Sequence, residues 1–258
     1  MPRRPTISLG RWFRMIDTLP PPPFSELAVF PASLPLELEV GSGRGLFLQN
    51  AGTACPDRNF LGVECDLKEA KRAAARLAKR QLTNTCVLGG DVKILMARYF
   101  PVGTLHGVHV YFPDPWWKKR HFKRRMFSPP FVNEAARLLR PGGLLHLWTD
   151  VAAYFEMAVD LVRAQPEFEP LPSPEERQPG HDMDYHTSFE RKKRKLGLPI
   201  YRACWSRSDA PPPESRSDEL LAHVSRVAIA GSAAAQPSDA DGPDDDQIEE
   251  PDDDFEDE

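Results

Sequence analysis

The stretch from Tyr111 to Arg125 combines the residue types that an active site facing nucleic acid needs. It follows a short apolar, β-branched run, Gly107 to Val110, which is typical of a buried strand. Asp114 comes next, between two prolines that restrict the backbone and so hold its carboxylate in a fixed place. Aromatic faces for base stacking and cations for phosphates then follow. These residues are Trp116, Trp117, Lys118, Lys119, Arg120, Lys123, Arg124 and Arg125.

The alternative interpretation of this stretch is an exposed basic loop whose tryptophans pack inward. The Pro-Asp-Pro-Trp element weighs against it, because a loop that carried only charge would not need a carboxylate fixed at a strand end. We therefore expect Asp114 to take part in chemistry. We expect Lys123, Arg124 and Arg125 to act mainly through their charge on phosphates.

A glycine-rich turn joins the first predicted strand, 36–40, to a helix. Gly41, Gly43 and Gly45 follow Glu39, and glycines permit a tight turn with close approach of a ligand to a helix N-terminus. Alone, the pattern could be a mere strand–helix connection. The dinucleotide fingerprint needs a glycine where this chain has Leu46, which disfavours a nicotinamide dehydrogenase. The spacing instead resembles the S-adenosylmethionine loop of class I methyltransferases.

Acidic residues stand at the ends of three consecutive predicted strands. Glu39 closes the first, Glu64 closes the second, and Asp91 follows the third. Glu64 could accept hydrogen bonds from both hydroxyls of a ribose, and Asp91 could accept one from an adenine amino group. Each acid alone could be a solvated charge. Together they mark the carboxyl edge of the sheet, where open α/β folds bind ligands.

Strands alternate with helices through the middle of the chain. We expect strands at 36–40, 59–64, 85–91, 107–111, 144–150 and 200–205, and helices at 67–81, 131–140 and 151–164. This order predicts an α/β fold, a mainly parallel sheet with helices on both faces. The predicted organisation is an irregular proline-rich extension at 1–35, a folded domain at 36–205, and a linker with a disordered acidic tail at 206–258.

The charge of the chain is unevenly distributed. The formal net charge is −5, but residues 239–258 hold 13 of the 38 acids and no Lys or Arg. Without them, 33 basic residues face 25 acidic ones, so the body is about +8 and suits an anionic partner. The four cysteines show no metal or redox spacing, and no apolar stretch is long enough for a signal peptide or a membrane span. We expect a cytoplasmic protein without a metal site.

The quoted motifs resemble the bacterial tRNA (guanine-N7)-methyltransferase family over about 36–205. The resemblance rests on EVGSGRG, GVE, FPDPWWKKRHFKRR, Thr149-Asp150, and TSFE at Thr187 to Glu190. It implies a Rossmann-like class I methyltransferase fold with a mostly parallel seven-stranded sheet and helices on both faces. It also implies S-adenosyl-L-methionine as cofactor, methylation of a variable-loop guanine, and tRNA as partner of a monomer or homodimer.

The resemblance further implies a role for particular residues. Cofactor contacts are implied for Glu39, Gly41, Gly43, Glu64, Asp91 and Asp114, with Asp114 at the catalytic centre. Guanine contacts are implied for Lys118, Asp150, Thr187, Ser188, Phe189 and Glu190.

Methylation at N7 requires little acid–base chemistry from these residues. N7 carries a lone pair and no hydrogen, so no general base is needed. Catalysis can rest on alignment and on carboxylates that stabilise positive charge on the ring. Asp114, Asp150 and Glu190 suit that task and can accept from N1–H and the N2 amino group, while Lys118 can donate to O6. His121 has no proton to remove, so we interpret it as a phosphate or packing contact.

Three alternatives stay open. Asp150 could instead be the N-cap of the helix that follows it. The enzyme could methylate another atom of an RNA base, although the order Pro113-Asp114-Pro115-Trp116 departs from the Asn/Asp-Pro-Pro-aromatic element of amino-methyltransferases. The chain could also be an RNA-binding module without catalysis, which its basic body supports and its complete set of acids opposes.

Overall fold

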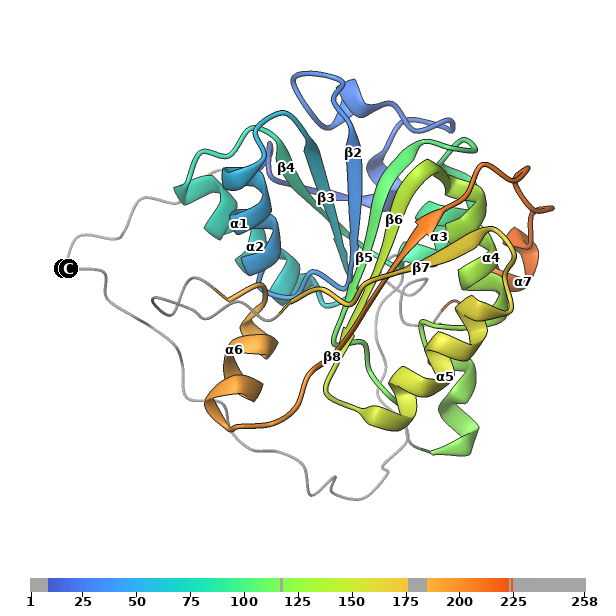
Figure 1. The fold of residues 1–258 in the computed structure, drawn as a ribbon. Coiled ribbons are helices and arrows are strands. Elements are labelled where there is room, and N and C mark those ends of the chain that lie inside the picture. Colours follow the sequence, from blue (N-terminus) through green and yellow to red (C-terminus); the bar gives the residue numbers. More distant parts are fainter. Residues whose placement is uncertain (1–8, 117, 176–184, 223, 225–258) are drawn as a thin grey trace, which may run out of the picture.

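Eight strands form one sheet at the centre of the computed structural model, which describes residues 9–116, 118–175, 185–222 and 224. The strands are β1 (Phe13–Met15), β2 (Leu36–Val40), β3 (Asn59–Glu64), β4 (Thr85–Gly89), β5 (Leu105–Tyr111), β6 (Leu139–Thr149), β7 (Phe168–Leu171) and β8 (Tyr201–Arg207). Their order in the sheet is β1-β4-β3-β2-β5-β6-β8-β7 (Figure 1). Neighbours from β1 to β6 pair in parallel, and β8 pairs antiparallel with both β6 and β7. The predicted, mostly parallel α/β fold is confirmed, with eight strands where seven were expected.

Helices cover both faces of the sheet, as predicted. The helices are α1 (Leu46–Ala54), α2 (Leu67–Lys79), α3 (Val92–Arg98), α4 (Pro129–Leu138), α5 (Ala152–Arg163), α6 (Ser188–Lys195) and α7 (Ser217–Leu221), with short 3₁₀ turns at Ile16–Thr18, Glu26–Ala28 and Lys119–Arg124. Figure 1 shows α1 and α2 on one side of the sheet and α3, α4, α5 and α7 on the other. The basic helix α6 stands apart from both layers.

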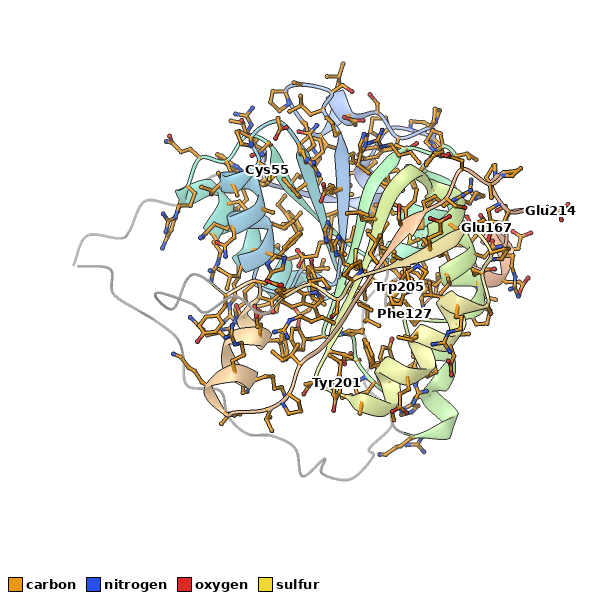
Figure 2. The ribbon with its side chains drawn as sticks, viewed as in Figure 1. Cys55, Phe127, Glu167, Tyr201, Trp205 and Glu214 are labelled. Carbon is orange, nitrogen blue, oxygen red and sulfur yellow. The ribbon has the colours of Figure 1, made fainter. Side chains whose placement is uncertain are left out.

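Side-chain alternation along the central strands separates an apolar face from a polar one. On β2, Leu36, Leu38 and Val40 are buried in the core that the sheet shares with α3, α4 and α5. Phe127 and Trp205, labelled in Figure 2, belong to the same core. The polar residues between them, Glu37 and Glu39 of β2 and His109 and Tyr111 of β5, project from the opposite face, where Tyr111 also belongs to a second apolar cluster. The polar chemistry of the sheet therefore lies on the side of α1.

The direction of strand order reverses next to β2. From β2 the chain steps to β3 and β4 on one side, and then to β5 and β6 on the other. Open α/β sheets bind ligands at the carboxyl ends of the strands beside such a reversal. Glu39 near the end of β2 and Asp114 just after β5 flank this point.

The prediction of an irregular extension over 1–35 is wrong for its described part. Strand β1 pairs in parallel with β4, and Phe13 lies opposite Val87. Ile16, Val29 and Phe30 are buried in the main core. A single strand of three residues leaves too short a pattern to be recognised in the sequence, and it is stabilised by the otherwise open edge of β4.

The folded domain also continues beyond residue 205, where a linker was predicted. Strand β8 runs to Arg207, and α7 packs against α3 and α4 with Leu220 fully buried. The carboxylate of Glu134, itself fully buried, accepts hydrogen bonds from the Ser215 hydroxyl at 2.9 Å and the Arg216 amide at 2.6 Å. These long-range contacts order a segment whose composition alone indicates a linker. The acidic tail predicted to be disordered lies outside the described residues.

Candidate active site

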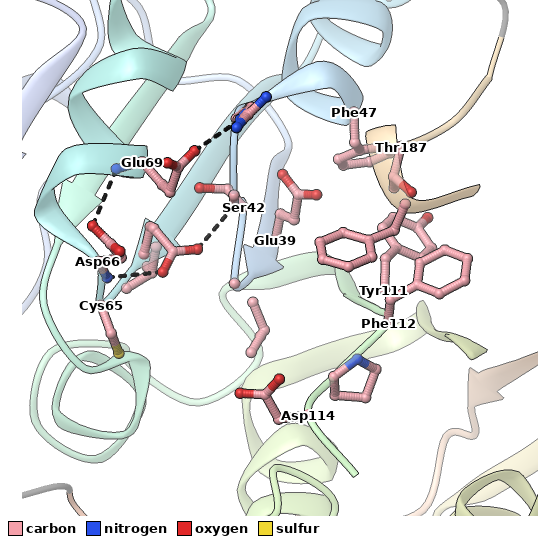
Figure 3. A pocket seen from close by; sticks show the side chains of 18 of the residues that line it. Glu39, Ser42, Phe47, Cys65, Asp66, Glu69, Tyr111, Phe112, Asp114 and Thr187 are labelled. Atoms are coloured by element: carbon pink, nitrogen blue, oxygen red, sulfur yellow. Dashed lines mark hydrogen bonds and ion pairs between the residues drawn. The ribbon is translucent and has the colours of Figure 1, made fainter. Parts of the chain in front are cut away.

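A cavity of about 870 Å³ opens at the carboxyl edge of the sheet, at the reversal of strand order. Its walls are residues 39–47, 63–66, 69, 90–93, 111–114, 116, 124, 126 and 187–189, together with Arg191, Lys192 and Lys195 of α6. Figure 3 shows Cys65 and Asp66 on one side of it and Tyr111, Phe112 and Thr187 on the other. The cavity thus brings together the glycine turn, the three acids, Asp114 and the start of α6.

The glycine turn presents its backbone to this cavity. Gly41 and Gly43 have φ of +72° and +48°, and a Cβ on either would meet nothing within 4 Å. Their left-handed backbone leaves free space where a ligand can approach. Gly45 has a left-handed backbone as well, with φ of +72°, and a Cβ there would also lie 2.8 Å from the Cβ of Ala73 on α2. The first two glycines therefore leave open space at the cavity wall, and the third allows close helix packing.

Two glutamates lie beneath the glycine turn. Glu64 accepts hydrogen bonds from the amides of Gly43 at 2.8 Å and Asp66 at 2.9 Å, and burial raises its pKa. Glu39 is 3% exposed, and burial, together with the charge of Glu64, raises its pKa well above the usual value. Its Oε2 has no hydrogen-bond partner among the described residues. A buried acid oxygen without a partner, in the wall of a cavity, is suited to accept from a ligand.

Asp91 has two functions at the cavity wall. Its carboxylate caps α3 by accepting from the amide of Lys93 at 2.9 Å, and it also lines the cavity. Asp66 caps α2 in the same way, accepting from Lys68 at 2.8 Å and Glu69 at 3.2 Å. Capping explains why aspartates stand at these positions.

Asp114 is held by an unusual turn. Phe112 and Trp116, on either side of it, have φ of +51° and +44°, which is strained for residues with large side chains. The Asp114 side chain faces the cavity and is still solvent-accessible, but the surrounding wall removes part of its hydration and raises its pKa. The predicted rigid placement of this carboxylate agrees with the geometry.

The basic run after Asp114 divides into different roles. Arg125 turns back and donates from Nε to the carbonyl of Pro115 at 2.8 Å, with a longer contact of 3.5 Å to the carbonyl of Trp116. This differs from its expected role on phosphate. Arg124 lies over the Trp116 ring at 5.1 Å, and His121 packs edge-on against the same ring at 5.4 Å. Trp117 and the side chains of Lys119 and Lys123 lie outside the described part of the structure.

The start of α6 forms the wall opposite the acids. Thr187 caps this helix, since its hydroxyl accepts from the amide of Glu190 at 3.0 Å. Thr187, Ser188 and Phe189 line the cavity. The Phe189 ring is 53% exposed and stacks on Phe112 with centroids 6.1 Å apart. Two aromatic rings from distant parts of the chain thus form an accessible flat surface beside the cavity.

Three predicted guanine contacts do not line the cavity. Lys118 is exposed, and Asp150 forms an ion pair with Lys193 of α6 at 2.8 Å. The alternative helix-capping role of Asp150 is wrong, because α5 begins after Val151 and has no side-chain cap. Glu190 is 4% exposed and lies 3.5 Å from the guanidinium of Arg202. Asp150 is thus paired with a cation, and the Glu190 carboxylate also accepts from the amide of His186 at 2.5 Å, so neither is directed at the cavity.

Tyr111 and Phe47 are wall residues that the sequence analysis missed. Tyr111 is 7% exposed and its ring packs edge-on against Phe47 of α1 at 5.1 Å. A signal for Tyr111 was present, because Glu39 pairs with His109 and side chains alternate along a strand. Tyr111 therefore had to share a face with Glu39. Within the described ranges, no group of three or more His, Cys, Asp or Glu side chains is arranged to hold a metal ion.

The fold and the cavity define the class of this protein. Its described part resembles the crystal structure of the 16S rRNA methyltransferase KamB, with a TM-score of 0.50 and 16% identity over 67% of this chain and 88% of that one. A family model described as a putative methyltransferase matches residues 33–203. This fold is that of a class I methyltransferase.

Sequence similarity specifies the family within this class. The chain is 47% identical over 208 residues to the tRNA (guanine-N(7)-)-methyltransferase of Rhodopirellula baltica, covering 78% of this chain and 76% of that protein. It is 36% identical over 177 residues to the enzyme of the same name from Alkalilimnicola ehrlichii, covering 69% and 74%. The chain belongs to the tRNA (guanine-N(7)-)-methyltransferase family.

Proposed function

We propose that the protein methylates N7 of a variable-loop guanine in tRNA, with S-adenosyl-L-methionine as the methyl donor. The observation that carries this proposal is the cavity, in which a cofactor turn, three strand-end acids and Asp114 meet the first turn of a basic helix. Membership of the family supports the choice of base atom and of tRNA.

The residues of the cavity fit S-adenosyl-L-methionine. Gly41 and Gly43 leave open space for a ligand at the backbone, and Glu39 offers an acid oxygen without a described partner. Glu39 and Glu64 have raised pKa values because they are buried. Hydroxyl and ammonium groups of the ligand would satisfy such acids and favour their ionised forms. When bound, the cofactor supplies an electrophilic methyl group on a sulfonium.

The chain's part in the reaction is alignment and electrostatics. The lone pair of N7 forms the new bond to the methyl carbon as the carbon–sulfur bond breaks, so a positive charge passes to the guanine ring. No proton leaves N7. We assign Asp114 to the catalytic centre, because its fixed carboxylate faces the cavity and can stabilise this charge.

Guanine recognition is assigned to the α6 side of the cavity. Phe189, stacked on Phe112, offers an aromatic surface for a base, and Thr187 and Ser188 offer hydroxyls beside it. Asp150 and Glu190 act in this proposal by holding α6 through Lys193 and Arg202. The exposed Lys118 is assigned to O6 of guanine or to a neighbouring phosphate of the same tRNA. We also propose a cytoplasmic location, because tRNA is the substrate and all four cysteines are free thiols. A monomer or homodimer stays a prediction.

The decisive experiment uses tRNA with 7-deazaguanine at the target position. This analogue replaces N7 by a C–H group and leaves the N1–H, N2 and O6 groups intact. We expect it to bind with a modest loss of affinity and to accept no methyl group from labelled cofactor. Nucleoside analysis of unmodified tRNA provides the positive control and identifies the methylated base.

Two other outcomes would contradict the proposal. Methyl transfer to the deaza substrate would place the reaction on N1, N2 or another atom, where a carboxylate would have a proton to remove. If calorimetry showed that the protein binds tRNA but not the cofactor, a non-catalytic RNA-binding module would be the better interpretation.

A further inference from the structure

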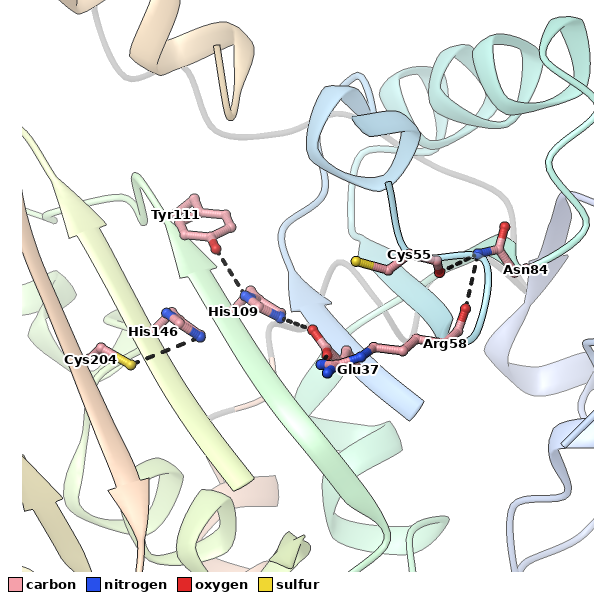
Figure 4. A network of polar contacts seen from close by, with 8 residues as sticks. All are labelled: Glu37, Cys55, Arg58, Asn84, His109, Tyr111, His146 and Cys204. Carbon is pink, nitrogen blue, oxygen red and sulfur yellow. Dashed lines mark hydrogen bonds and ion pairs between the residues drawn. The ribbon is translucent and has the colours of Figure 1, made fainter. Parts of the chain in front are cut away.

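A continuous chain of polar side chains crosses the α1 face of the sheet and ends beside the cavity. Arg58 contacts Glu37 at 2.5 Å, and the other Glu37 oxygen lies 2.7 Å from Nε2 of His109. Nδ1 of His109 lies 2.9 Å from the hydroxyl of Tyr111, which in turn lies 3.2 Å from Nε2 of His186. Figure 4 shows Glu37, His109 and Tyr111 in a row from β2 to β5. The family motifs and the catalytic proposal make no use of this chain of contacts.

The chemistry of these groups gives the chain of hydrogen bonds a direction. Burial raises the pKa of Glu37, but the opposing effect of His109 and Arg58 is larger and lowers it to about 2, so the carboxylate only accepts. A carboxylate has no hydrogen to donate, so His109 donates to Glu37 from Nε2, and in the tautomer whose only ring hydrogen is on Nε2, Nδ1 accepts from the Tyr111 hydroxyl. Burial keeps that hydroxyl protonated, because it raises the pKa of Tyr111 well above the usual value. The Tyr111 oxygen can then accept from Nε2–H of His186.

His186 is held firmly at the other end. Its ring stacks on Trp148 with centroids 4.7 Å apart and packs on Phe47 at 5.1 Å and on Tyr111 at 5.2 Å. Its backbone amide donates to the carboxylate of Glu190 at 2.5 Å. Side chain and backbone of one residue thus connect the polar chain in the sheet to the first turn of α6.

His186 directly precedes the start of α6, which lines the cavity, so its contacts can fix the position of that wall. Thr187, the next residue, is the N-cap of α6, and Thr187 to Phe189 form the cavity wall assigned to guanine. Asn50 of α1 adds a contact of 2.9 Å to the carbonyl of Tyr185. The segment just before the wall is therefore fastened to α1 and to β5, not only to its own helix.

We propose that Tyr111 and His186 are positioning residues. Their hydrogen bond, aligned by His109 and Glu37, holds the first turn of α6 against the cavity, and this places N7 of the guanine in line for methyl transfer. This inference rests on the proposed function for its substrate. None of the four residues needs to touch the guanine or exchange a proton with it. Their effect passes through Thr187 to Phe189.

The test removes one oxygen atom. Tyr111→Phe keeps the ring packing and loses the hydroxyl that links His109 to His186. We expect kcat/KM for tRNA to fall about tenfold, which corresponds to one buried hydrogen bond, with cofactor affinity within about twofold of wild type. Tyr99→Phe is the matched control, because it removes a hydroxyl 3.4 Å from the Ile16 carbonyl on the other face of the sheet. It should leave kcat/KM unchanged.

A second pair of variants covers the case in which Tyr111→Phe folds poorly. His186→Gln keeps an N–H donor near the place of Nε2, whereas His186→Leu removes it. The glutamine variant should retain most of the tRNA activity and the leucine variant should lose it.

Amide hydrogen exchange gives a readout that does not depend on the proposed function. In the ligand-free protein, exchange in α6 should accelerate in Tyr111→Phe and His186→Leu and stay near wild type in His186→Gln and Tyr99→Phe. If the wild-type enzyme fails to methylate tRNA, the proposed function is refuted. Hydrogen exchange in α6 still tests whether Tyr111 and His186 hold that helix in place. If Tyr111→Phe lowers the melting temperature but leaves both α6 exchange and kcat/KM unchanged, these residues are only structural and the inference is overturned.

Discussion

At the scale of the residue, the neighbouring cations Arg124 and Arg125 make different contacts. Arg124 lies over the face of Trp116 and is exposed, whereas the Arg125 guanidinium bonds back to the carbonyl of Pro115. The Arg125 contact supports the strained turn that carries Asp114. Adjacent arginines in one basic run therefore have different surroundings, because Arg124 faces solvent and the cavity whereas Arg125 contacts the turn that carries Asp114.

This difference predicts separate kinetic effects. Arg125→Ala should lower kcat at saturating tRNA by about 10- to 100-fold, because a loosened turn misplaces Asp114. Arg124→Ala should mainly raise the KM for tRNA and reduce the salt dependence of binding by about one phosphate contact. Steady-state kinetics at several salt concentrations would separate the two. Equal effects of both variants on KM alone would show that Arg125 also acts on phosphate.

Glu39 illustrates a residue whose placement costs stability. Burial raises its pKa in the folded state above the unfolded value of about 4.5, so the folded protein binds the proton more tightly than the unfolded chain. Ionisation then opposes folding. The stability of the ligand-free protein should fall as the pH rises from about 4.5 toward the raised pKa, and the full cost is present above it.

The variant Glu39→Gln tests directly whether the ionised Glu39 destabilises the folded protein. The variant should melt at a higher temperature than wild type at pH 7.5, and the difference should shrink as the pH approaches 4.5. Its affinity for S-adenosyl-L-methionine should fall at least about tenfold, because an amide replaces the acceptor that the ligand needs. Calorimetric melting and cofactor titration on the same preparations provide both numbers. A variant that is less stable at pH 7.5 would contradict the sign.

At the scale of the element, α7 completes the core instead of forming part of a linker. It brings Leu220 into contact with α3 and α4 and brings the Ser215 hydroxyl and Arg216 amide to the buried Glu134. Without α7, Glu134 would keep Arg137 at 2.7 Å but lose two donors. The residues that lead into this short helix thus satisfy a buried carboxylate of α4.

Truncation experiments should reveal this contribution. A chain that ends at residue 208 should lose about 3 kcal/mol of unfolding free energy or more, from the lost burial of Leu220 and the unsatisfied Glu134. A chain that ends at residue 224 retains α7 and serves as the control, with stability close to full length. Leu220→Ala alone should cost about 2–5 kcal/mol. Equal denaturation midpoints for the two truncations would show that α7 adds nothing.

At the scale of the whole molecule, charge is divided between a basic body and an acidic end. The last 20 residues contribute 13 acids to a chain whose remaining part is about +8. Two dense groups of cations, on the stretch after Asp114 and on α6, adjoin the cavity. Acids on the same chain can compete with phosphates for these cations.

Neutralising the acidic end should therefore change RNA binding rather than chemistry. Replacing the acids of residues 239–258 by Asn and Gln keeps the chain length and should tighten binding of non-cognate RNA severalfold at low salt. The difference should disappear as salt rises, and kcat for tRNA should stay the same. Filter binding over a salt series measures the effect. Identical affinities at all salt concentrations would show that this end does not compete for the basic surface.

The sequence by itself determined the class of fold, and it determined that the glycine turn and the acids Glu39, Glu64 and Asp91 meet at one edge of the sheet. Local patterns suffice for these features, because parallel strands joined by helices bring the carboxyl ends of their strands to a common edge. The placement of Asp114 followed from its flanking prolines. Motif similarity predicted the family, and the comparisons confirm it.

Only the tertiary structure decided which polar side chains face the cavity. Asp150 and Glu190 stand in family motifs, yet their orientation depends on Lys193 and Arg202, which lie on other elements. Strand β1 and helix α7 likewise depend on the edge of β4 and on the buried Glu134. Such contacts join residues far apart in the chain, and their energy depends on burial and geometry that no local pattern of residue types contains.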